Sequence, residues 1–573
     1  MSGFDATTSF ARTLVDEWVR NGITAAVVSP GSRNTPLTLA LARDGRMNVD
    51  VVLDERSAGF RALGIGLATG RPAIVCCTSG TAAVNLHPAV VEAHHARVPL
   101  LACTADRPAE LRDWGAGQTI DQAGLYGGAV RWFHDPGPPD ETLSGSEANG
   151  RWRALACRTA AHASGPPAGP VHLNLPFQEP LVPTGAPLLD TPGRAEGAPW
   201  IRASRARREP ANDDLARIGA LVRAHPRGVL VAGWGAGVDP VVAERFARAA
   251  GWPIVADPIS QLRTGPYAVS TYDALLRVDG FARAHEPELV VRVGGPLTSK
   301  IANAWLDDIP TVLVDPDDAW LDPQHAAHER VQADGNALLA ALTKELAGPY
   351  SRQWLAEWRA AEQRARRALD RVLDDDIACE GRIARDVAAA VPVDGALLVA
   401  SSLPVRALEW CMTPRAHLRV LANRGVNGID GFVSTVFGVA SAHAGPVVAL
   451  CGDLCLLHDT NGLLVGDRSG GRAGARPPVT FVVVDNDGGG IFSYLPQHEL
   501  AEFERLFATP QAVDVVAVAR AHGVAAERVE LAAVPKLVAE GADTDRVLVV
   551  PVDRRAAVEQ HTRGWHAVAT SLA

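Results

Sequence analysis

The sequence lacks any long apolar stretch. Among its 573 residues we find no run near the roughly 20 consecutive apolar residues that a membrane-spanning helix needs. The first residues, MSGFDATTSFARTL, also lack the basic segment and the apolar segment that together form a secretion signal. We therefore expect a cytoplasmic protein with no membrane partner.

An excess of positive charge is missing as well. The chain has 55 Lys and Arg residues against 65 Asp and Glu residues, which gives a formal net charge of −10. A protein that binds nucleic acid normally presents a basic face, often with aromatic side chains between the cations, and no such stretch is present. We expect no nucleic-acid partner, and an anionic substrate would have to be bound by local arginines.

Cysteine motifs for metal binding are missing. The eight cysteines lie mostly inside apolar stretches, with no CxxC pair and no spacing typical of a zinc site. They are Cys76, Cys77, Cys103, Cys157, Cys379, Cys411, Cys451 and Cys455. We predict that all of them are reduced, buried thiols.

Nucleotide-binding motifs are weak or missing. No GxxxxGK[ST] loop occurs, so the sequence contains no motif that indicates ATP hydrolysis. The segment GWGAG (233–237) follows an expected strand, but VDP comes next instead of a third glycine that opens a helix. A non-catalytic nucleotide-binding or regulatory protein, built from Rossmann-like blocks, stays open as an alternative at this point.

What the sequence does contain is an alternation of short apolar runs with amphipathic segments, in three blocks. This pattern is typical of parallel β-sheets covered by helices. The expected strands lie within 25–29, 49–54, 72–78 and 99–105; within 228–237, 252–257, 287–295 and 310–317; and within 395–401, 446–453, 478–486 and 546–553. We predict an α/β protein with three doubly wound parallel-sheet domains in series.

Two segments without sheet patterning separate the blocks. The first is rich in Pro, Gly and charge, as linkers are, and the second is a long, charged, helix-like stretch. The predicted organisation is a first domain at 1–183, a linker at 184–213, a central Rossmann-like domain at 214–345, a helical linker at 346–379 and a third domain at 380–573.

Acidic residues follow two expected strands of the third block. Asp453 comes directly after the run VVALCG, and Asp487 stands in VVVDNDGGGIF, after the next expected strand. Carboxyl ends of parallel strands meet at one edge of a sheet, and oxygen ligands suit Mg²⁺. Either segment alone is an ordinary polar turn. Together they predict a site for a divalent metal and a diphosphate, with room for phosphate oxygens beside the glycines.

This pair of segments resembles the motif of thiamine diphosphate enzymes, which opens with GDG and closes with two asparagines. The chain departs from it at Leu454 and at Asp487, although a carboxylate can bind Mg²⁺ at least as well as an amide. The separation is also longer, which we attribute to a loop insertion at 466–478. The resemblance implies thiamine diphosphate with Mg²⁺ (or Mn²⁺), the metal being held by Asp453, Asp487 and the Gly489 carbonyl.

The first block resembles the pyrimidine-binding domain of the same enzymes. Its stretch 54–107 contains CTSGTAAVNL, similar to the TSGPGxxNL turn of the family. The resemblance implies that Glu55, an acid at a strand end, bonds to N1′ of the pyrimidine ring. It would thereby favour the tautomer whose N4′ takes the proton from thiazolium C2. Considered by itself, a glutamate at a strand end is usually a solvated surface charge.

Further segments resemble one branch of this family, the 2-succinyl-5-enolpyruvyl-6-hydroxy-3-cyclohexene-1-carboxylate synthases of menaquinone biosynthesis. They are AAVVSPGSRNTPLTLAL (25–41), ADRPAELRDWGAGQTIDQ (105–122), LTSK (297–300), SSLPVRALEW (401–410) and ANRGVNGIDGFVSTVFGVA (422–440). The resemblance implies a transferase that decarboxylates 2-oxoglutarate and adds the resulting carbanion equivalent to isochorismate by conjugate addition. The alternative is another thiamine diphosphate-dependent 2-oxoacid decarboxylase or an acetolactate-type synthase.

The resemblance also implies roles for individual residues. Both substrates are dicarboxylic acids, so their pocket needs fixed cations, preferably guanidinium groups. Isochorismate is assigned to Ser32, Arg33, Arg107, Gln118 and Lys300, and the succinyl carboxylate to Arg406 and Arg424, with Ser402 in the same catalytic set. Cofactor contacts are assigned to Thr78, Gly452, Ile429 beneath the two rings, and an apolar wall of Ile491, Phe492 and Leu495. Family members bind the cofactor between subunits, which implies a homodimer or a dimer of dimers.

Overall fold

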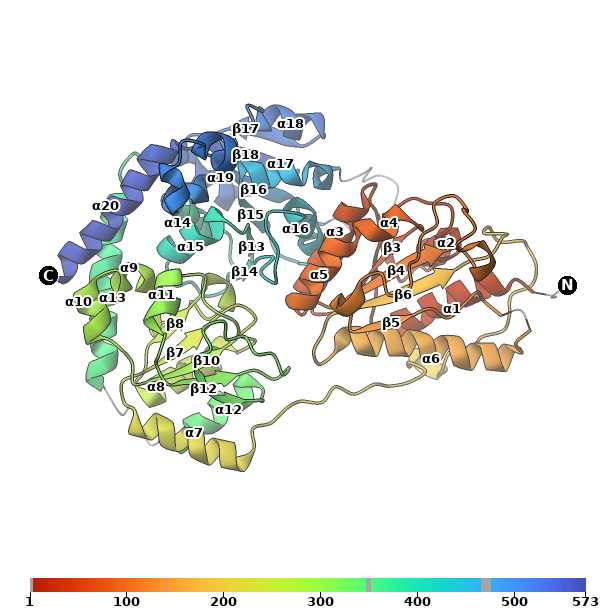
Figure 1. Cartoon of the computed structure of the whole chain (residues 1–573), viewed down its shortest axis with the longest axis horizontal. Coiled ribbons are helices and arrows are strands. Elements are labelled where there is room, and N and C mark those ends of the chain that lie inside the picture. Colours follow the sequence, from red (N-terminus) through yellow and green to blue (C-terminus); the bar gives the residue numbers. More distant parts are fainter. Residues whose placement is uncertain (1–3, 141, 347–351, 465–475) are drawn as a thin grey trace.

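The computed structural model describes residues 4–140, 142–346, 352–464 and 476–573. Within them the chain forms three sheets of six strands each, and every strand pair in the three sheets is parallel. Figure 1 shows the three domains that contain these sheets, with the N-terminal domain at one end of the molecule. The predicted fold class is therefore confirmed.

The N-terminal domain holds its strands in the order β2-β1-β3-β4-β6-β5. They are β1 (Ala25–Val28), β2 (Asn48–Val51), β3 (Ala73–Cys77), β4 (Leu100–Asp106), β5 (Trp132–His134) and β6 (Pro170–Pro176), with helices α1 (Ala6–Arg20), α2 (Thr35–Arg43), α3 (Glu55–Thr69), α4 (Thr81–Asn85), α5 (His87–His95) and α6 (Gly145–Ser164). The first four are strands that the apolar runs predict. The last two were not predicted.

The middle domain has the strand order β12-β11-β10-β7-β8-β9. Its strands are β7 (Gly228–Ala232), β8 (Ile254–Ala256), β9 (Ala268–Val269), β10 (Leu289–Val293), β11 (Thr311–Val314) and β12 (Ala327–Val331), and its helices are α7 (Asn212–Ala224), α8 (Pro240–Ala250), α9 (Tyr272–Leu276), α10 (Asp279–Ala284), α11 (Lys300–Trp305) and α12 (Gly335–Glu345). Between β6 and α7, residues 177–211 cross the molecule with one short turn at Ala195–Gly197 (Figure 1).

The C-terminal domain has the strand order β14-β13-β15-β16-β18-β17. Its strands are β13 (Ala396–Val399), β14 (Arg419–Leu421), β15 (Val447–Gly452), β16 (Val479–Asp485), β17 (Ala525–Arg528) and β18 (Arg546–Pro551), and its helices are α14 (Glu380–Ala390), α15 (Leu403–Cys411), α16 (Phe432–Ala440), α17 (Asp453–His458), α18 (Val515–Ala521), α19 (Val534–Glu540) and α20 (Arg554–Leu572). Most of the predicted insertion at 466–478 lies outside the described residues.

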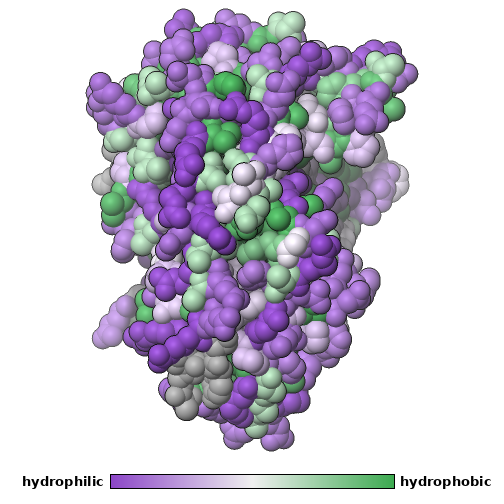
Figure 2. All heavy atoms as spheres, turned by 90° about the vertical axis from the view of Figure 1, so that its left-hand side faces the viewer, coloured by the Kyte–Doolittle hydropathy of each residue, from purple (hydrophilic) through white to green (hydrophobic). Residues whose placement is uncertain are grey.

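The middle and C-terminal domains share one hydrophobic core, to which the long helix α13 (Arg352–Leu373) contributes. The buried residues of α13 include Trp354, Trp358, Ala361 and Ala365, which recur at helical spacing on one face. Figure 2 shows the face of the molecule that carries α13 and α20, where apolar atoms gather near the centre and polar atoms cover most of the rest. The C-terminal and middle domains are thus packed together through α13.

The N-terminal domain contacts the C-terminal domain through the crossing of α3 and α16. A Cβ atom at Gly64 would lie 2.2 Å from the Thr435 carbonyl oxygen, and one at Gly438 would lie 2.0 Å from the Arg61 carbonyl oxygen. Glycine is therefore required at both places, because any side chain would push the helices apart. This close packing fixes the position of α3, which begins at Glu55.

All eight cysteines are buried and free, as predicted. Burial raises the pKa of the Cys76 and Cys411 thiols to about 12, so both stay protonated at neutral pH. Among the residues that the structure describes, no helix is long and apolar enough to cross a bilayer.

Candidate active site

The two predicted acidic turns lie side by side at one edge of the third sheet. Strands β15 and β16 pair in parallel, with Gly452 opposite Val484, so their carboxyl ends meet at the same edge. The main-chain N–H of Gly488 donates a hydrogen bond of 2.8 Å to Oδ2 of Asp453. A cavity of about 430 Å³ opens there, and its lining includes Asp453, Asp485 and Asp487. The structure brings together the carboxylates that the sequence assigns to the metal.

The surroundings of Asp453 are those expected of a cation ligand. Its other oxygen, Oδ1, is buried and has no hydrogen-bond partner. Burial, together with the nearby charges of Asp485 and Asp487, raises the pKa of Asp453 to about 6, although hydrogen bonds from the main chain of Leu454 and Gly488 oppose that rise. A bound divalent cation would satisfy the unpaired oxygen and offset the repulsion. These residues therefore fit Mg²⁺.

Further ligands of a metal at this place would be main-chain or non-protein oxygens. Within the described residues, no three His, Cys, Asp or Glu side chains gather as a metal site. Two carboxylates, a carbonyl and ligand oxygens, as in a metal-diphosphate complex, are consistent with that arrangement. The assignment of the third ligand to the Gly489 carbonyl stays a prediction.

The glycines of the turn have a structural task within this chain. Gly488 has φ of +123°, and a Cβ atom there would lie 2.1 Å from the Ala508 carbonyl oxygen. The N–H of Gly489 donates to the same carbonyl at 2.7 Å. These glycines thus allow the turn to lie close to the main chain at Ala508. The sequence interpretation had considered only the diphosphate.

A buried pair behind the turn was missed by the sequence analysis. The side-chain amide of Asn486 donates to Oε1 of Glu380 at 2.9 Å, and Glu380 is 3% exposed. Burial raises the pKa of Glu380, while the bond from Asn486 opposes that rise. Since Asn486 directly precedes Asp487, this pair anchors the turn from inside the domain. The only signal in the sequence is an acid at the first position of α14, which is common at helix starts.

His561 lies next to this pair and makes stability depend on pH. Its Nε2 accepts a 3.0 Å hydrogen bond from the Gly381 N–H, its Nδ1 contacts the Tyr494 hydroxyl, and burial lowers its pKa from 6.5 to about 4. Below pH 6.5 His561 binds a proton in the unfolded chain but stays neutral in the folded chain. The free energy of unfolding therefore falls as pH decreases from about 6.5 to about 4. Across this pH range the free energy of unfolding decreases by about 3 kcal/mol.

The measurement is the melting temperature at pH 7.5 and at pH 5.0, for the wild type and for His561→Gln. The variant retains an acceptor for Gly381 but cannot titrate, so we expect a smaller drop in its melting temperature between the two pH values. An equal drop in both proteins would contradict this role of His561.

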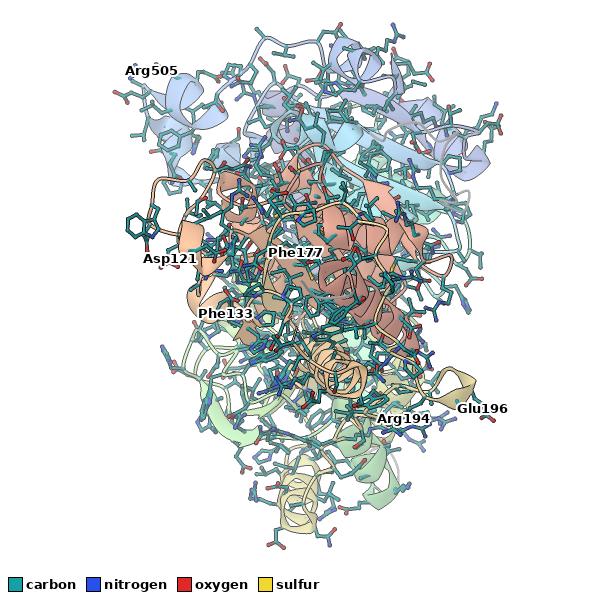
Figure 3. The ribbon with its side chains drawn as sticks, turned by 90° about the vertical axis from the view of Figure 1, so that its right-hand side faces the viewer. Asp121, Phe133, Phe177, Arg194, Glu196 and Arg505 are labelled. Carbon is teal, nitrogen blue, oxygen red and sulfur yellow. The ribbon has the colours of Figure 1, made fainter. Side chains whose placement is uncertain are left out.

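In the N-terminal domain, the predicted isochorismate residues gather at the carboxyl ends of β1, β3 and β4. Arg107 donates to the Ser79 hydroxyl at 3.2 Å, and the Gln118 side-chain amide donates to the Ser79 carbonyl at 3.1 Å. Ser32 is exposed, whereas Thr78 is buried beside Gly31. Figure 3 looks onto this domain, and Asp121, which follows Gln118 closely, projects at its rim. Three segments distant in the sequence thus form one polar group.

Arg33 belongs to the same group but is only 7% exposed. It donates to the Phe177 carbonyl at 2.8 Å and pairs with Glu179 at 3.3 Å. Burial lowers the pKa of Arg33, and the neighbouring charge of Arg107 lowers it further. Phe177 is labelled in Figure 3. In this structure, Arg33 therefore ties the start of α2 to the segment after β6, while its Nε atom stays unpaired.

In the C-terminal domain, the predicted succinyl-binding residues lie at the ends of β13 and β14. Arg406 donates to the Ser402 carbonyl at 2.6 Å. Burial lowers the pKa of Arg406, and the charge of Arg424 adds to that effect, so the two guanidinium groups are neighbours. The Nε atom of Arg424 is buried without a partner. The charges of the two guanidinium groups act on each other, and the Arg424 Nε–H has no partner. Such an arrangement suits a carboxylate ligand.

A second missed residue fixes the loop that follows Arg424. The buried carboxylate of Glu92, on α5, accepts hydrogen bonds from the main-chain N–H groups of Gly425, Val426 and Asn427 at 2.7 to 2.8 Å. Because Glu92 belongs to the N-terminal domain, this contact joins two domains next to a predicted substrate residue. An isolated glutamate on a helix carries no sequence signal for such a role.

The predicted residues near the cofactor rings are partly buried. Ile429 packs against the core of the C-terminal domain. Ile491, Phe492 and Leu495 are each half-buried, and the ring of Phe492 lies 5.7 Å from that of Phe507. Their assignment as an apolar wall stays a prediction.

None of the contacts described above involves Lys300 or Glu55. Lys300 is the exposed first residue of α11 in the middle domain. Glu55 is half-buried and begins α3, because β2 ends at Val51 and the Asp54 side chain caps the helix by accepting from Arg56 N–H. The expected strand 49–54 is thus shorter than predicted. The cavity beside Asp453 is lined by residues of the C-terminal domain, and Glu55 is not among them.

Comparisons with known proteins agree with this arrangement. Residues 8–125 match the family model described as "Thiamine pyrophosphate enzyme, N-terminal TPP binding domain", and residues 194–399 match "Middle domain of thiamine pyrophosphate". Among solved structures, a benzoylformate decarboxylase from Polynucleobacter necessarius superposes with a TM-score of 0.72, at 18% identity, over 95% of this chain and 99% of that chain. At this identity the likeness shows the fold alone.

Sequence relatives identify the branch of the family. A 2-succinyl-5-enolpyruvyl-6-hydroxy-3-cyclohexene-1-carboxylate synthase from Thermobifida fusca is 45% identical over 99% of both chains. One from Myxococcus xanthus is 42% identical over 98% of this chain and 97% of the relative. The chain is an enzyme of the thiamine diphosphate-dependent class and belongs to the 2-succinyl-5-enolpyruvyl-6-hydroxy-3-cyclohexene-1-carboxylate synthase family.

Proposed function

We propose that this protein decarboxylates 2-oxoglutarate and joins the succinyl fragment to isochorismate by conjugate addition, as a step of menaquinone biosynthesis. The observation that carries the proposal is 45% identity over 99% of the chain to a synthase named for that product. The adjacent cations Arg406 and Arg424 support it, because a dicarboxylic substrate needs such groups.

Thiamine diphosphate, when bound, supplies the thiazolium carbon on which a 2-oxoacid loses CO₂. Asp453 and Asp487, with the Gly489 carbonyl, would hold the Mg²⁺ (or Mn²⁺) that carries the diphosphate; the unpaired, buried Oδ1 of Asp453 supports this assignment. Glu55 would bond to the pyrimidine ring. The half-buried side chains of Ile491 and Phe492 would exclude water from the reacting carbon.

Arginines and their neighbours would orient the two substrates. Arg406 and Arg424 would bind the distal carboxylate of the 2-oxoglutarate fragment, and the polar group of Arg107, Gln118 and Ser32 would bind isochorismate. Arg107 keeps donors for a ligand, since its hydrogen bonds to the Ser79 hydroxyl and to the Gly117 carbonyl use one N–H of each terminal nitrogen. Arg33 would contribute through its unpaired Nε atom or by holding the group together.

The complete site would form between two copies of the chain in a homodimer or a dimer of dimers. Apolar side chains flank Glu55 and are exposed in the single chain: Val51 is 64% and Leu53 70% exposed. On the segment that joins Arg107 to Gln118, Trp114 is 82% exposed. Exposed apolar groups beside site residues favour coverage by a partner. The enzyme would act in the cytoplasm.

The test combines the purified protein with thiamine diphosphate, Mg²⁺, 2-oxoglutarate and isochorismate, and follows isochorismate loss with mass detection of the product. We expect product only when all four are present. Release of CO₂ without loss of isochorismate would contradict the proposal and would indicate a different thiamine diphosphate-dependent 2-oxoacid decarboxylase.

A further inference from the structure

Three buried carboxylates surround the turn that precedes Lys300. Asp257 accepts from the Thr298 N–H at 2.7 Å, Asp273 accepts from the Ser299 hydroxyl at 2.6 Å, and Glu409 accepts from the Ser299 N–H at 2.9 Å. All three carboxylates are at most 2% exposed. The main chain next to Lys300 is therefore held on several sides.

Glu409 differs from the other two carboxylates because it comes from another domain. It lies on α15 of the C-terminal domain, whereas Asp257, Asp273 and the turn belong to the middle domain. Its Oε1 atom also accepts from the Tyr272 hydroxyl at 2.5 Å. One carboxylate oxygen thus connects α15 to two segments of the middle domain.

The same side chain has a feature that stability alone does not explain. Its second oxygen, Oε2, is buried without a partner. Burial raises the pKa of Glu409 well above its ordinary value, and the charges of Asp257 and Asp273 add to this. A buried acid with an unsatisfied oxygen destabilises the fold relative to a well-packed neutral side chain. A carboxylate in this position is therefore expected to have a task beyond stability.

Arg406 provides that task. It stands three residues before Glu409 on α15, a spacing that places two side chains on the same side of a helix. Burial and the neighbouring Arg424 lower the pKa of Arg406, and the carboxylate of Glu409 acts in the opposite direction. In its ionised form Glu409 would support the positive charge of one predicted substrate residue, and it accepts from the main chain beside another.

We infer that Glu409 is a positioning residue that fixes Lys300 and Arg406 relative to each other across the junction of the middle and C-terminal domains. The inference rests on the proposed function, in which these two cations bind different substrates. Carbon–carbon bond formation needs both substrates in one geometry, and small displacements are costly to such reactions. A single buried carboxylate bonded on both sides of the junction would keep that geometry.

The test is Glu409→Gln in the full-length enzyme with cofactor bound. The amide oxygen can still accept from Ser299 and Tyr272, but the side chain can no longer ionise. We expect the KM values for both 2-oxoglutarate and isochorismate to rise, with kcat/KM for each lowered by roughly 10-fold or more. The affinity for thiamine diphosphate should stay unchanged, because Glu409 does not line the cavity at Asp453.

The matched control is Glu362→Gln. Glu362, on α13, also accepts hydrogen bonds from the middle domain, but from the Ser270 hydroxyl and from the main-chain N–H and hydroxyl of Thr271 instead of from the turn before Lys300. We expect this variant to lower the melting temperature and leave both KM values unchanged. If Glu409→Gln behaves in the same way, Glu409 is only structural and the inference is overturned.

Two further variants keep the test decisive if Glu409→Gln folds poorly. Tyr272→Phe removes one donor to Glu409 and should raise both KM values by a smaller factor. In a double-mutant cycle, the factors by which Tyr272→Phe and Lys300→Met raise the KM values should not multiply, because both changes act through the turn before Lys300. Strict multiplication, or unchanged KM values in Tyr272→Phe, would overturn the inference. Absence of product with the wild type would instead overturn the proposed function.

Discussion

Replacing Glu55 with Gln is expected to abolish turnover while the protein still folds and binds thiamine diphosphate. The amide has the shape of the carboxylate but cannot share a proton with the pyrimidine ring, and loss of such a group costs about 100-fold to 10,000-fold in rate. Folding should be preserved because α3 is fixed elsewhere, by its Asp54 cap and by its close crossing with α16. This is the largest effect that we predict.

The measurement pairs steady-state turnover with calorimetric titration of the cofactor. Glu110→Gln serves as the control, since Glu110 is an exposed acid of the same domain that accepts a 3.1 Å hydrogen bond from the Gln178 side chain. It should leave turnover unchanged. Full activity in Glu55→Gln would show that the half-buried acid at the start of α3 has no part in the reaction.

Replacing Asp453 with Asn is expected to weaken binding of the Mg²⁺–thiamine diphosphate complex by about 100-fold or more, because an anionic metal ligand becomes neutral. The wild type should become more stable on addition of the complex, by about 2.7 kcal/mol at a concentration 100 times the Kd. The variant should lose most of this gain. The protein without cofactor should stay folded, because burial already disfavours the charge of Asp453.

The readout is the melting temperature with and without the complex, supported by calorimetric titration. Asp487→Asn is the matched control, because the resembling motif has Asn at that position. We expect it to retain most of the cofactor-induced rise. An undiminished rise in Asp453→Asn would exclude Asp453 as a metal ligand.

Local sequence determined the architecture to a large extent. Apolar runs such as VVALCG and VTFVVV can be buried on both faces only in a covered parallel sheet, and all such runs that we identified are strands. The acidic turns after β15 and β16 were predictable as a pair, because parallel strands end at a common edge. The short strands β5, β9, β14 and β17 were missed, since so few residues carry no clear period, and β6 and β12 were missed as well.

Local sequence could not reveal which acids hold the site together. Glu92, Glu380 and Glu409 each look like ordinary helix glutamates, but each is buried and bonded to residues 100 or more positions away. The same holds for Arg33, whose burial depends on contacts with the segment after β6. Such roles arise only when distant segments are packed together.

The amino-acid sequence by itself thus determined the three-sheet fold and the acids and arginines at strand ends, because hydrophobic period and short motifs are local properties. Only the tertiary structure decided how those groups are held: Asp453 by the glycine turn, Arg424 by Glu92, and the Lys300 turn by Glu409. The physical reason is that a buried charge must find partners wherever the packed chain supplies them, and those partners need not be near in sequence.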